Sequence, residues 1–241
     1  DAHAARRAES PFATGAVDDR LRRALRDHVS RSRQLLRAVP APSFVSTPDL
    51  LADLPDGHWL PLVVDTAAWQ SQHPPLSRER RPVVVHAPSR AALKGSAVID
   101  AVLERLAADG IVDYVRVAGV SRTELRERVL DADVVIDQLG IGSYGVLACE
   151  AMAAGRIVVG DPSEQVRAVV SEATGREVPI TVTSSAGLEA SIREICTRPD
   201  AAVRRAAEGP AFIADVHDGR RAAATIAAVC GLGPASTRMD A

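Results

Sequence analysis

The sequence predicts an α/β protein built on a Rossmann-like open parallel sheet with helices on both faces, and two observations lead to that fold class. Hydrophobic residues make up 46% of the 241 residues but aromatic residues only 3%, so valine, leucine, isoleucine and alanine must form the core. From position 83 onward, short runs of β-branched residues alternate with segments of helical periodicity. That alternation is typical of a parallel sheet with crossover helices.

The elements of this sheet domain are expected at short intervals. Its strands are expected at 83–85, 112–117, 134–136, 157–159 and 180–182. Its helices are expected at 97–106, 123–130, 144–154, 164–171 and 186–196, followed by a helical region over 200–230. In the first of these helices, Val98, Val102 and Leu106 repeat every four residues and so share one face. We therefore expect one Rossmann-like domain over 76–230 and a tail over 231–241.

The N-terminal third has weaker signals. An arginine-rich helix is expected over 17–39, and short strands at 44–45 and 59–65. The polar, proline-rich stretch 70–82 is expected to link two domains. Since two weak strands cannot make a second domain of the same kind, we interpret 1–75 as an incomplete domain remnant plus the start of this linker. The chain begins at Asp1 without a Met or a signal-peptide core, as a fragment would.

Charge and cysteine usage narrow the class of protein. A net charge of −2 argues against a dedicated nucleic-acid binder. Cys149, Cys196 and Cys230 have neither metal-ligand spacing nor the pattern of a disulfide framework, and they suit a reducing, cytoplasmic compartment. The arginines of the helix over 17–39 are interpreted first as a solvated face. A basic helix of this kind can also contact anionic lipid, so peripheral membrane contact stays open.

Lys94 is the only lysine among the 29 lysines and arginines. Lysine is a compact point charge that binds phosphate, whereas arginine is a broad planar fork. Lys94 follows the strand over 83–85, in a loop that also holds His86 and Arg90 and ends at Gly95. Ligands of open parallel sheets bind at the carboxyl ends of the strands. The residue is therefore a candidate phosphate ligand, and the alternative is a chance survivor exposed to water.

A second strand-end loop runs from Asp137 to Gly145 and opens a helix that carries Glu150. Its glycines, at 140, 142 and 145, match the G-x-G-x-x-G spacing of dinucleotide-binding loops. The acidic residue Asp161 comes early for that fingerprint, the loop follows the third strand rather than the first, and Lys94 is left without a role. Dinucleotide binding, as of NAD, and a plain glycine turn both remain alternatives. Asp137 and Asp161 are expected to cap loops or helices.

Several ordered motifs together resemble a known family. The segments His86–Gly95, Ala132–Gln138, Gly142–Gly145 and Glu150–Gly155 resemble the C-terminal, donor-nucleotide half of a GT-B glycosyltransferase. The resemblance is to the retaining, sugar-nucleotide-dependent type related to family 4, and it is densest between 83 and 160. It implies that the chain binds a UDP- or GDP-sugar and transfers the sugar to an acceptor that the sequence does not identify. It implies no metal and no cofactor.

The resemblance also implies roles for individual residues. Lys94 with Arg90 would bind the donor diphosphate, Glu150 would hold the ribose, and the amides of 143–145 would face the sugar or a phosphate. The segment 118–121 would contact the base, and His86 is expected to shape its loop rather than perform acid–base chemistry. The donor-binding set is Arg90, Lys94, Ser143, Tyr144, Gly145 and Glu150, with His86, Val120 and Gln138 as further candidates.

The sequence departs from the family at one informative position. The first glutamate of the family's E-x7-E motif, which contacts the donor sugar, falls on Gly142. No catalytic residue can be assigned, because the acceptor domain that would supply one is largely missing; His28 and His58 do not match it, and His217 is expected to be structural. A non-catalytic nucleotide-binding or interaction module therefore stays open beside the enzyme.

Overall fold

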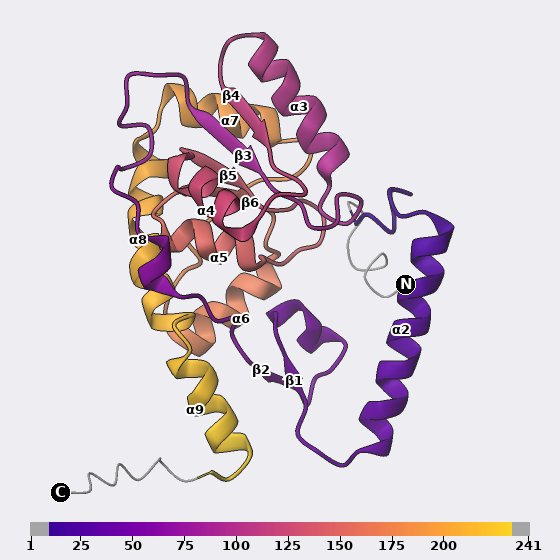
Figure 1. Ribbon diagram of the computed structural model, residues 1–241. Helices are drawn as coiled ribbons and strands as arrows, with labels where there is room; N and C mark the ends of the chain where they lie inside the picture. The colour runs from indigo at the N-terminus through magenta and orange to yellow at the C-terminus, as the bar shows by residue number, and fades with distance from the viewer. Residues whose placement is uncertain (1–9, 233–241) are drawn as a thin grey trace, which may run out of the picture.

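Short segments, three of them runs of β-branched residues, form five strands in the computed structural model, which describes residues 10–232 (Figure 1). The strands are β3 (Val83–His86), β4 (Asp113–Arg116), β5 (Val134–Ile136), β6 (Ile157–Gly160) and β7 (Thr181–Val182). They lie in the order β4-β3-β5-β6-β7, and every neighbouring pair is parallel. The predicted open parallel sheet is confirmed, and each of its five expected strands is present.

Helices alternate with these strands as expected. They are α3 (Ser96–Ala108), α4 (Arg122–Asp131), α5 (Val146–Ala153), α6 (Glu164–Thr174), α7 (Leu188–Thr197), α8 (Asp200–Val216) and α9 (Arg220–Val229). Two of them begin with serine caps: the Ser121 hydroxyl accepts from the amide of Glu124 at 3.1 Å, and the Ser163 hydroxyl accepts from the amide of Val166 at 3.2 Å. These caps satisfy amide groups that the first helical turn leaves without a partner.

The face that α3 buries is rotated from the predicted one. Ile99, Leu103 and Leu106 are fully buried, whereas Val98 is 42% exposed. Steps of four and then three residues follow a helix of 3.6 residues per turn more closely than two steps of four. The prediction that Val98 shares the buried face is therefore wrong, although the helix itself is confirmed.

Helices cover both faces of the sheet because side chains alternate along each strand. Val85 and Val135 face a core formed with α4, α5 and α6. Val84 and Val134 face the opposite core, formed with α3 and α7, and α8 contributes residues to both. Helix α8 also approaches α5 closely, since a Cβ at Gly209 would lie 2.5 Å from the carbonyl oxygen of Met152. Helix α5 is thus held between the sheet and α8.

From residue 10 to residue 69 the chain has little regular structure besides one long helix. The elements of this N-terminal part are α2 (Asp19–Ala38), β1 (Phe44–Val45), the 3-10 helix η1 (Pro48–Ala52), β2 (His58–Trp59) and the 3-10 helix η2 (Thr66–Trp69). Strands β1 and β2 form a separate parallel pair. The strand expected over 59–65 ends early, because Pro61 has no amide hydrogen to donate and the amide of Val64 donates to the carbonyl of His217 instead.

His217 joins this N-terminal part to the sheet domain. Its ring is buried and lies against the rings of Trp59, Tyr144 and Phe212. Its Nδ1 lies 2.8 Å from the carbonyl oxygen of Leu62 and its Nε2 lies 3.2 Å from the Tyr144 hydroxyl. The carbonyl can only accept, so Nδ1 carries the hydrogen and Tyr144 donates to Nε2. Burial lowers the pKa of His217 to about 4, which keeps the ring neutral.

The stretch 70–82 is irregular, as its prolines and charges predict, and it runs along the sheet domain in contact with it. The buried carboxylate of Asp133 accepts from the amides of Leu76 and Val83 at 2.8 and 2.9 Å. The guanidinium of Arg156 donates to the carbonyl of His73. These contacts fix the path by which the chain enters β3.

Candidate functional site

The Lys94 loop and the glycine loop meet at the carboxyl edge of the sheet because β3 and β5 are neighbours. His86, the last residue of β3, pairs with Ile136, the last residue of β5. Each loop therefore leaves the sheet beside the other. Two backbone contacts fix them together: the amide of Leu139 donates to the carbonyl of Lys94 at 3.2 Å, and Gly95 packs against the carbonyl of Leu139.

Gly95 is required at this meeting point for two reasons. Its φ is +72°, in the left-handed region that a residue with a side chain adopts at a cost. A Cβ on Gly95 would also lie 3.0 Å from the carbonyl oxygen of Leu139. The glycine therefore allows helix α3 to begin at Ser96 while the Lys94 loop lies against the glycine loop.

Lys94 forms an ion pair with Asp137 close to the start of α5. Its Nζ lies 2.8 Å from one carboxylate oxygen of Asp137, and the other oxygen accepts from the amide of Gly145 at 2.8 Å. The Lys94 side chain is 13% exposed and that of Asp137 only 1%. A Cβ on Gly145 would lie 3.7 Å from the Lys94 ammonium. A cation and the amino end of a helix thus converge on one point, the arrangement that binds anions in proteins.

The buried side chain of His86 joins the end of β5 to the start of α3 by two hydrogen bonds. Its Nδ1 lies 2.9 Å from the carbonyl oxygen of Ile136 and its Nε2 lies 2.8 Å from the hydroxyl of Ser96. The carbonyl fixes the hydrogen on Nδ1, so the serine donates to Nε2. Burial lowers the pKa of His86 to about 4, opposed by the bond to Ile136. A neutral ring with both nitrogens occupied fits a role in shaping the loop.

Glu150 lies on α5 and is almost fully buried. One of its carboxylate oxygens accepts from the guanidinium of Arg122, the first residue of α4, at 2.8 Å. The Arg122 side chain is 74% exposed, and its guanidinium lies 6.0 Å from the ring centre of the buried Trp69. Burial raises the pKa of Glu150, and the charge of Arg122 opposes that rise. The Glu150 carboxylate is therefore a buried hydrogen-bond acceptor beside the solvent-exposed guanidinium of Arg122.

Three polar residues of the glycine loop, Gln138, Ser143 and Tyr144, point toward the protein interior. The side-chain amide of Gln138 donates to the carbonyl of Ser143 at 2.7 Å. The Ser143 hydroxyl is buried and has no hydrogen-bond partner among the described residues. Tyr144 turns its side chain into the core toward His217. The ligand contacts predicted for 143–145 stay predictions, and the side chain of Tyr144 would take no part in them.

The two remaining candidates lie on exposed parts of neighbouring loops. Arg90 is exposed, and its carbonyl accepts from the amides of Leu93 and Lys94, which makes the turn before α3. Val120 is 37% exposed in the loop between β4 and α4. The roles of Arg90 and Val120 in a donor site stay predictions.

Asp161 fastens the glycine loop from the next strand. Its carboxylate accepts from the amide of Gly140 at 3.2 Å, and the carbonyl of Gly142 accepts from the amide of Ser163. Gly140 and Gly142 have φ values of +88° and +86°. Both glycines and Asp161 are thus accounted for by the shape of the loop. The acid that dinucleotide binding needs for a ribose is here bonded to the loop itself.

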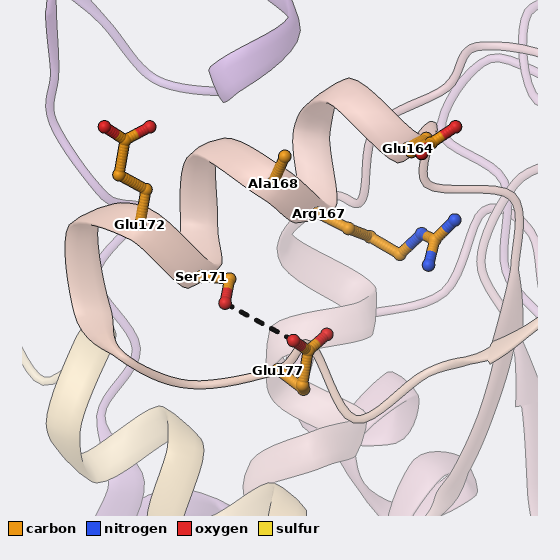
Figure 2. A pocket seen from close by; sticks show the side chains of 6 residues that line it. All are labelled: Glu164, Arg167, Ala168, Ser171, Glu172 and Glu177. Atoms are coloured by element: carbon orange, nitrogen blue, oxygen red, sulfur yellow. Dashed lines mark hydrogen bonds between the residues drawn. The ribbon is translucent and has the colours of Figure 1, made fainter.

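A shallow open depression of about 510 Å³ lies elsewhere, along the outer side of α6 (Figure 2). It is lined by Glu164, Arg167, Ala168, Ser171, Glu172 and Glu177. Figure 2 shows the Ser171 hydroxyl directed at Glu177, 3.3 Å away, while Glu172 points away from both. None of the predicted donor residues lines it, and its three glutamates oppose a phosphate. Within residues 10–232 no group of three or more histidine, cysteine, aspartate or glutamate side chains is placed to hold a metal ion.

Two residues of this site go beyond what the sequence predicts. Asp137 does bond the amide of Gly145, as a cap would, but it also pairs with Lys94. Arg122 has no predicted role. A signal for it exists, because a basic residue in the first turn of a helix is unfavourable to the helix dipole and so indicates another partner. That partner is Glu150.

Comparisons with known proteins give structural likeness without sequence likeness. No family model matches the chain, and no curated protein matches it. Among solved structures, HepE from Anabaena, solved with UDP and glucose, aligns over 79% of this chain at 14% identity, with a TM-score of 0.57. TarM from S. aureus, solved with UDP among its ligands, aligns over 78% at 12% identity, with a TM-score of 0.55. WaaG, a glycosyltransferase involved in lipopolysaccharide biosynthesis, aligns over 78% at 15% identity, with a TM-score of 0.52.

The alignments span less than two thirds of each of these proteins. They cover 63% of HepE, 43% of TarM and 62% of WaaG. The order of elements and the parallel sheet agree with the fold that the motifs of the Lys94 loop and of the glycine loop predict. The chain therefore has the fold of the GT-B group 1 glycosyltransferases, at low sequence identity to the solved examples.

Proposed function

We propose that the sheet domain binds the diphosphate of a sugar nucleotide and that the chain is the donor-binding part of a glycosyltransferase. The observation that carries the proposal is the position of Lys94 beside the amino end of α5, with Glu150 on the same helix. A diphosphate at that helix end would meet the Lys94 ammonium and would compete with the Asp137 carboxylate for the amide of Gly145. Glu150 lies five residues further on, about one and a half helical turns, within the span of a nucleotide.

The chemistry follows from the charges. When a glycosidic bond to a diphosphate breaks, negative charge grows on the departing phosphate. A fixed ammonium and a helix amino end stabilise that charge without reorganising, which is the usual electrostatic contribution to catalysis. Glu150 is suited to a ribose diol, since a buried carboxylate accepts hydroxyl hydrogen bonds strongly. Arg122 already occupies one of its oxygens, so a ribose would share the carboxylate with Arg122 or displace it.

The solved structures of the same fold make a uridine nucleotide the first ligand to test, because HepE and TarM were crystallised with UDP. GDP is the second. The acceptor and the transferred sugar are not identified by this site, and no side chain is assigned as catalytic. The free thiols of Cys149, Cys196 and Cys230 favour a reducing, cytoplasmic location.

A second function is favoured by one position. Gly142 stands where the family has the glutamate that contacts the donor sugar, and its positive φ and its bond to Ser163 give it a structural role. A glycine in place of that glutamate is what we expect of a non-catalytic domain that binds a nucleotide and transfers no sugar. The two functions share nucleotide binding and differ in turnover.

Calorimetric titration of the chain with UDP, GDP and NAD tests the proposal. UDP or GDP is expected to bind, and Lys94→Ala is expected to weaken binding about ten- to a hundredfold, since a bond to a charged group contributes about 1.5–3 kcal/mol. Arg204→Ala, an exposed cation of α8, is the control and should leave affinity unchanged. Folded protein that binds no nucleoside diphosphate contradicts the proposal. Binding of NAD alone would favour the dinucleotide alternative.

A further inference from the structure

Helix α2 is an amphipathic helix that contacts the segment before it through Arg22, which donates to the carbonyl of Phe12 and lies over the Phe12 ring. It runs for 20 residues, about 30 Å, and none of its side chains is buried. Figure 1 shows it as the indigo helix that stands apart from the sheet domain. No other described helix or strand packs extensively against it. The function proposed above makes no use of it.

One face of α2 is apolar. Leu21, Leu25, Val29 and Leu36 recur at spacings of four and seven residues, which places them along one stripe. Val29 and Leu36 are 47% and 46% exposed, and Leu35 beside them is 65% exposed. Leu21 and Leu25 are half-buried, so the exposed part of the stripe is its C-terminal half. An exposed apolar patch of this kind marks a surface that contacts something else.

The rest of the helix is strongly basic. Helix α2 contains seven arginines and two aspartates, a formal charge of +5, although the whole chain carries −2. At 100° per residue, Arg20, Arg23 and Arg31 lie opposite the apolar stripe, and all three are exposed. Arg33 lies at the border of the stripe and Arg37 beyond it, and both are exposed. Helix α2 therefore carries a net positive charge, whereas the rest of the chain is net negative.

We infer that α2 lies flat on an anionic lipid surface, with its apolar stripe in the bilayer and its arginines on the lipid phosphates. A single apolar stripe on an otherwise polar, arginine-rich helix is the property of helices that bind membrane interfaces. Arginines at the borders of the stripe can extend their charged ends outward while their stems stay in the apolar layer. None of the described helices is long and apolar enough to cross a bilayer.

Charge complementarity favours lipid over a second copy of this chain. Two α2 helices meeting along the same stripe would bring +5 against +5. An anionic leaflet attracts each arginine near its surface, and the attraction falls off within a Debye length. Lipid binding of α2 would therefore weaken steeply as salt increases.

Co-sedimentation with lipid vesicles tests this inference on the full chain. The chain is expected to pellet with vesicles of equal parts phosphatidylglycerol and phosphatidylcholine, and to stay in solution with phosphatidylcholine alone. The double variant Arg33→Gln/Arg37→Gln should lower the partition coefficient about ten- to thirtyfold, since each arginine contributes about one factor of five. Arg204→Gln/Arg205→Gln removes the same charge from α8 and should change it little.

A second variant tests the apolar stripe. Val29→Ser/Leu36→Ser should also reduce pelleting, while circular dichroism and the thermal midpoint confirm that the sheet domain is folded. Three results would overturn the inference: no pelleting by the folded wild-type chain, equal pelleting with neutral vesicles, or a dimer in sedimentation velocity that the α2 variants abolish. The last would assign the stripe to a second copy. None of these readouts depends on nucleotide binding.

Discussion

Asp137→Asn should make the protein less stable and its nucleotide binding tighter. The Asp137 carboxylate, 1% exposed, is the counter-ion of Lys94 at 2.8 Å. Removing one partner of a buried pair costs about 3–5 kcal/mol because the other charge is left unpaired. Lys94 keeps 13% exposure, so we expect a smaller loss, about 2–3 kcal/mol. For a chain of this size that is a drop of about 5–10 °C in the unfolding midpoint.

The same substitution removes a repulsion from the proposed donor site. A phosphate on the Lys94 ammonium would lie about 4 Å from the Asp137 carboxylate, where two like charges repel by about 4 kcal/mol at an effective dielectric constant of about 20. Water reaches the site through Lys94, and part of the repulsion is already offset by the ammonium itself. If a third of it is relieved, UDP binds about tenfold more tightly.

Calorimetry and thermal unfolding, each with and without UDP, measure both effects on one pair of proteins. The UDP-induced rise in midpoint should be larger for Asp137→Asn than for the wild type. Lys94→Gln/Asp137→Asn should recover part of the lost stability and lose the gain in affinity, because no unpaired charge remains. Weaker UDP binding by Asp137→Asn would refute the reasoning, since it would mean that Asp137 holds Lys94 in place for the ligand and does not compete with it.

Two further predictions concern stability. Gly95→Ala should destabilise by about 2–3 kcal/mol in urea unfolding, and Gly175→Ala, at a similar φ of +69° but with no atom within 4 Å, by only the backbone cost of about 1–2 kcal/mol. Equal losses of stability in the two variants would show that the close approach of Gly95 to Leu139 contributes nothing. The pKa values of His86 and His217 are lowered to about 4, so the unfolded chain takes up protons below pH 6.5 that the folded chain does not. Stability should therefore be complete above pH 6.5 and fall by about 2–3 kcal/mol per pH unit toward pH 4. An unfolding midpoint unchanged between about pH 7 and pH 5.5 would contradict this.

Much of the sheet domain follows from local sequence. Runs of valine and isoleucine predict the central strands β3, β5 and β6, because burial on both faces demands β-branched residues in a row. The edge strands β4 and β7 include polar residues and are less buried. The predicted start of α5 lies two residues early. Tyr144 carries the helical pattern forward, but its side chain bonds His217 in the core, and Gly145 is extended with a ψ of −173°. A tertiary contact with a residue 73 positions away decides that boundary.

Part of the candidate site also follows from the sequence. The positions of Lys94 and Glu150, in and after strand-end loops, can be predicted, because the alternation of strands and helices sets which loops share an edge. The ion-pair partners of these two residues cannot be predicted in this way. Asp137 is 43 residues from Lys94, and Arg122 is 28 residues from Glu150. Ion pairs of this separation depend on the three-dimensional path of the loops, which spacing in one sequence does not encode.

The bond between Leu62 and His217 closes a loop of 155 residues. This has a consequence for biosynthesis, because chains fold as they leave the ribosome and N-terminal parts emerge first. The sheet strands are all released before Phe212, Ile213 and Val216, which complete the core on one face. Until that last segment emerges, α5 lacks the cover that α8 provides. The nascent sheet domain is then a natural client for chaperones that recognise exposed apolar surface, and a stop codon before Phe212 would leave it in that state.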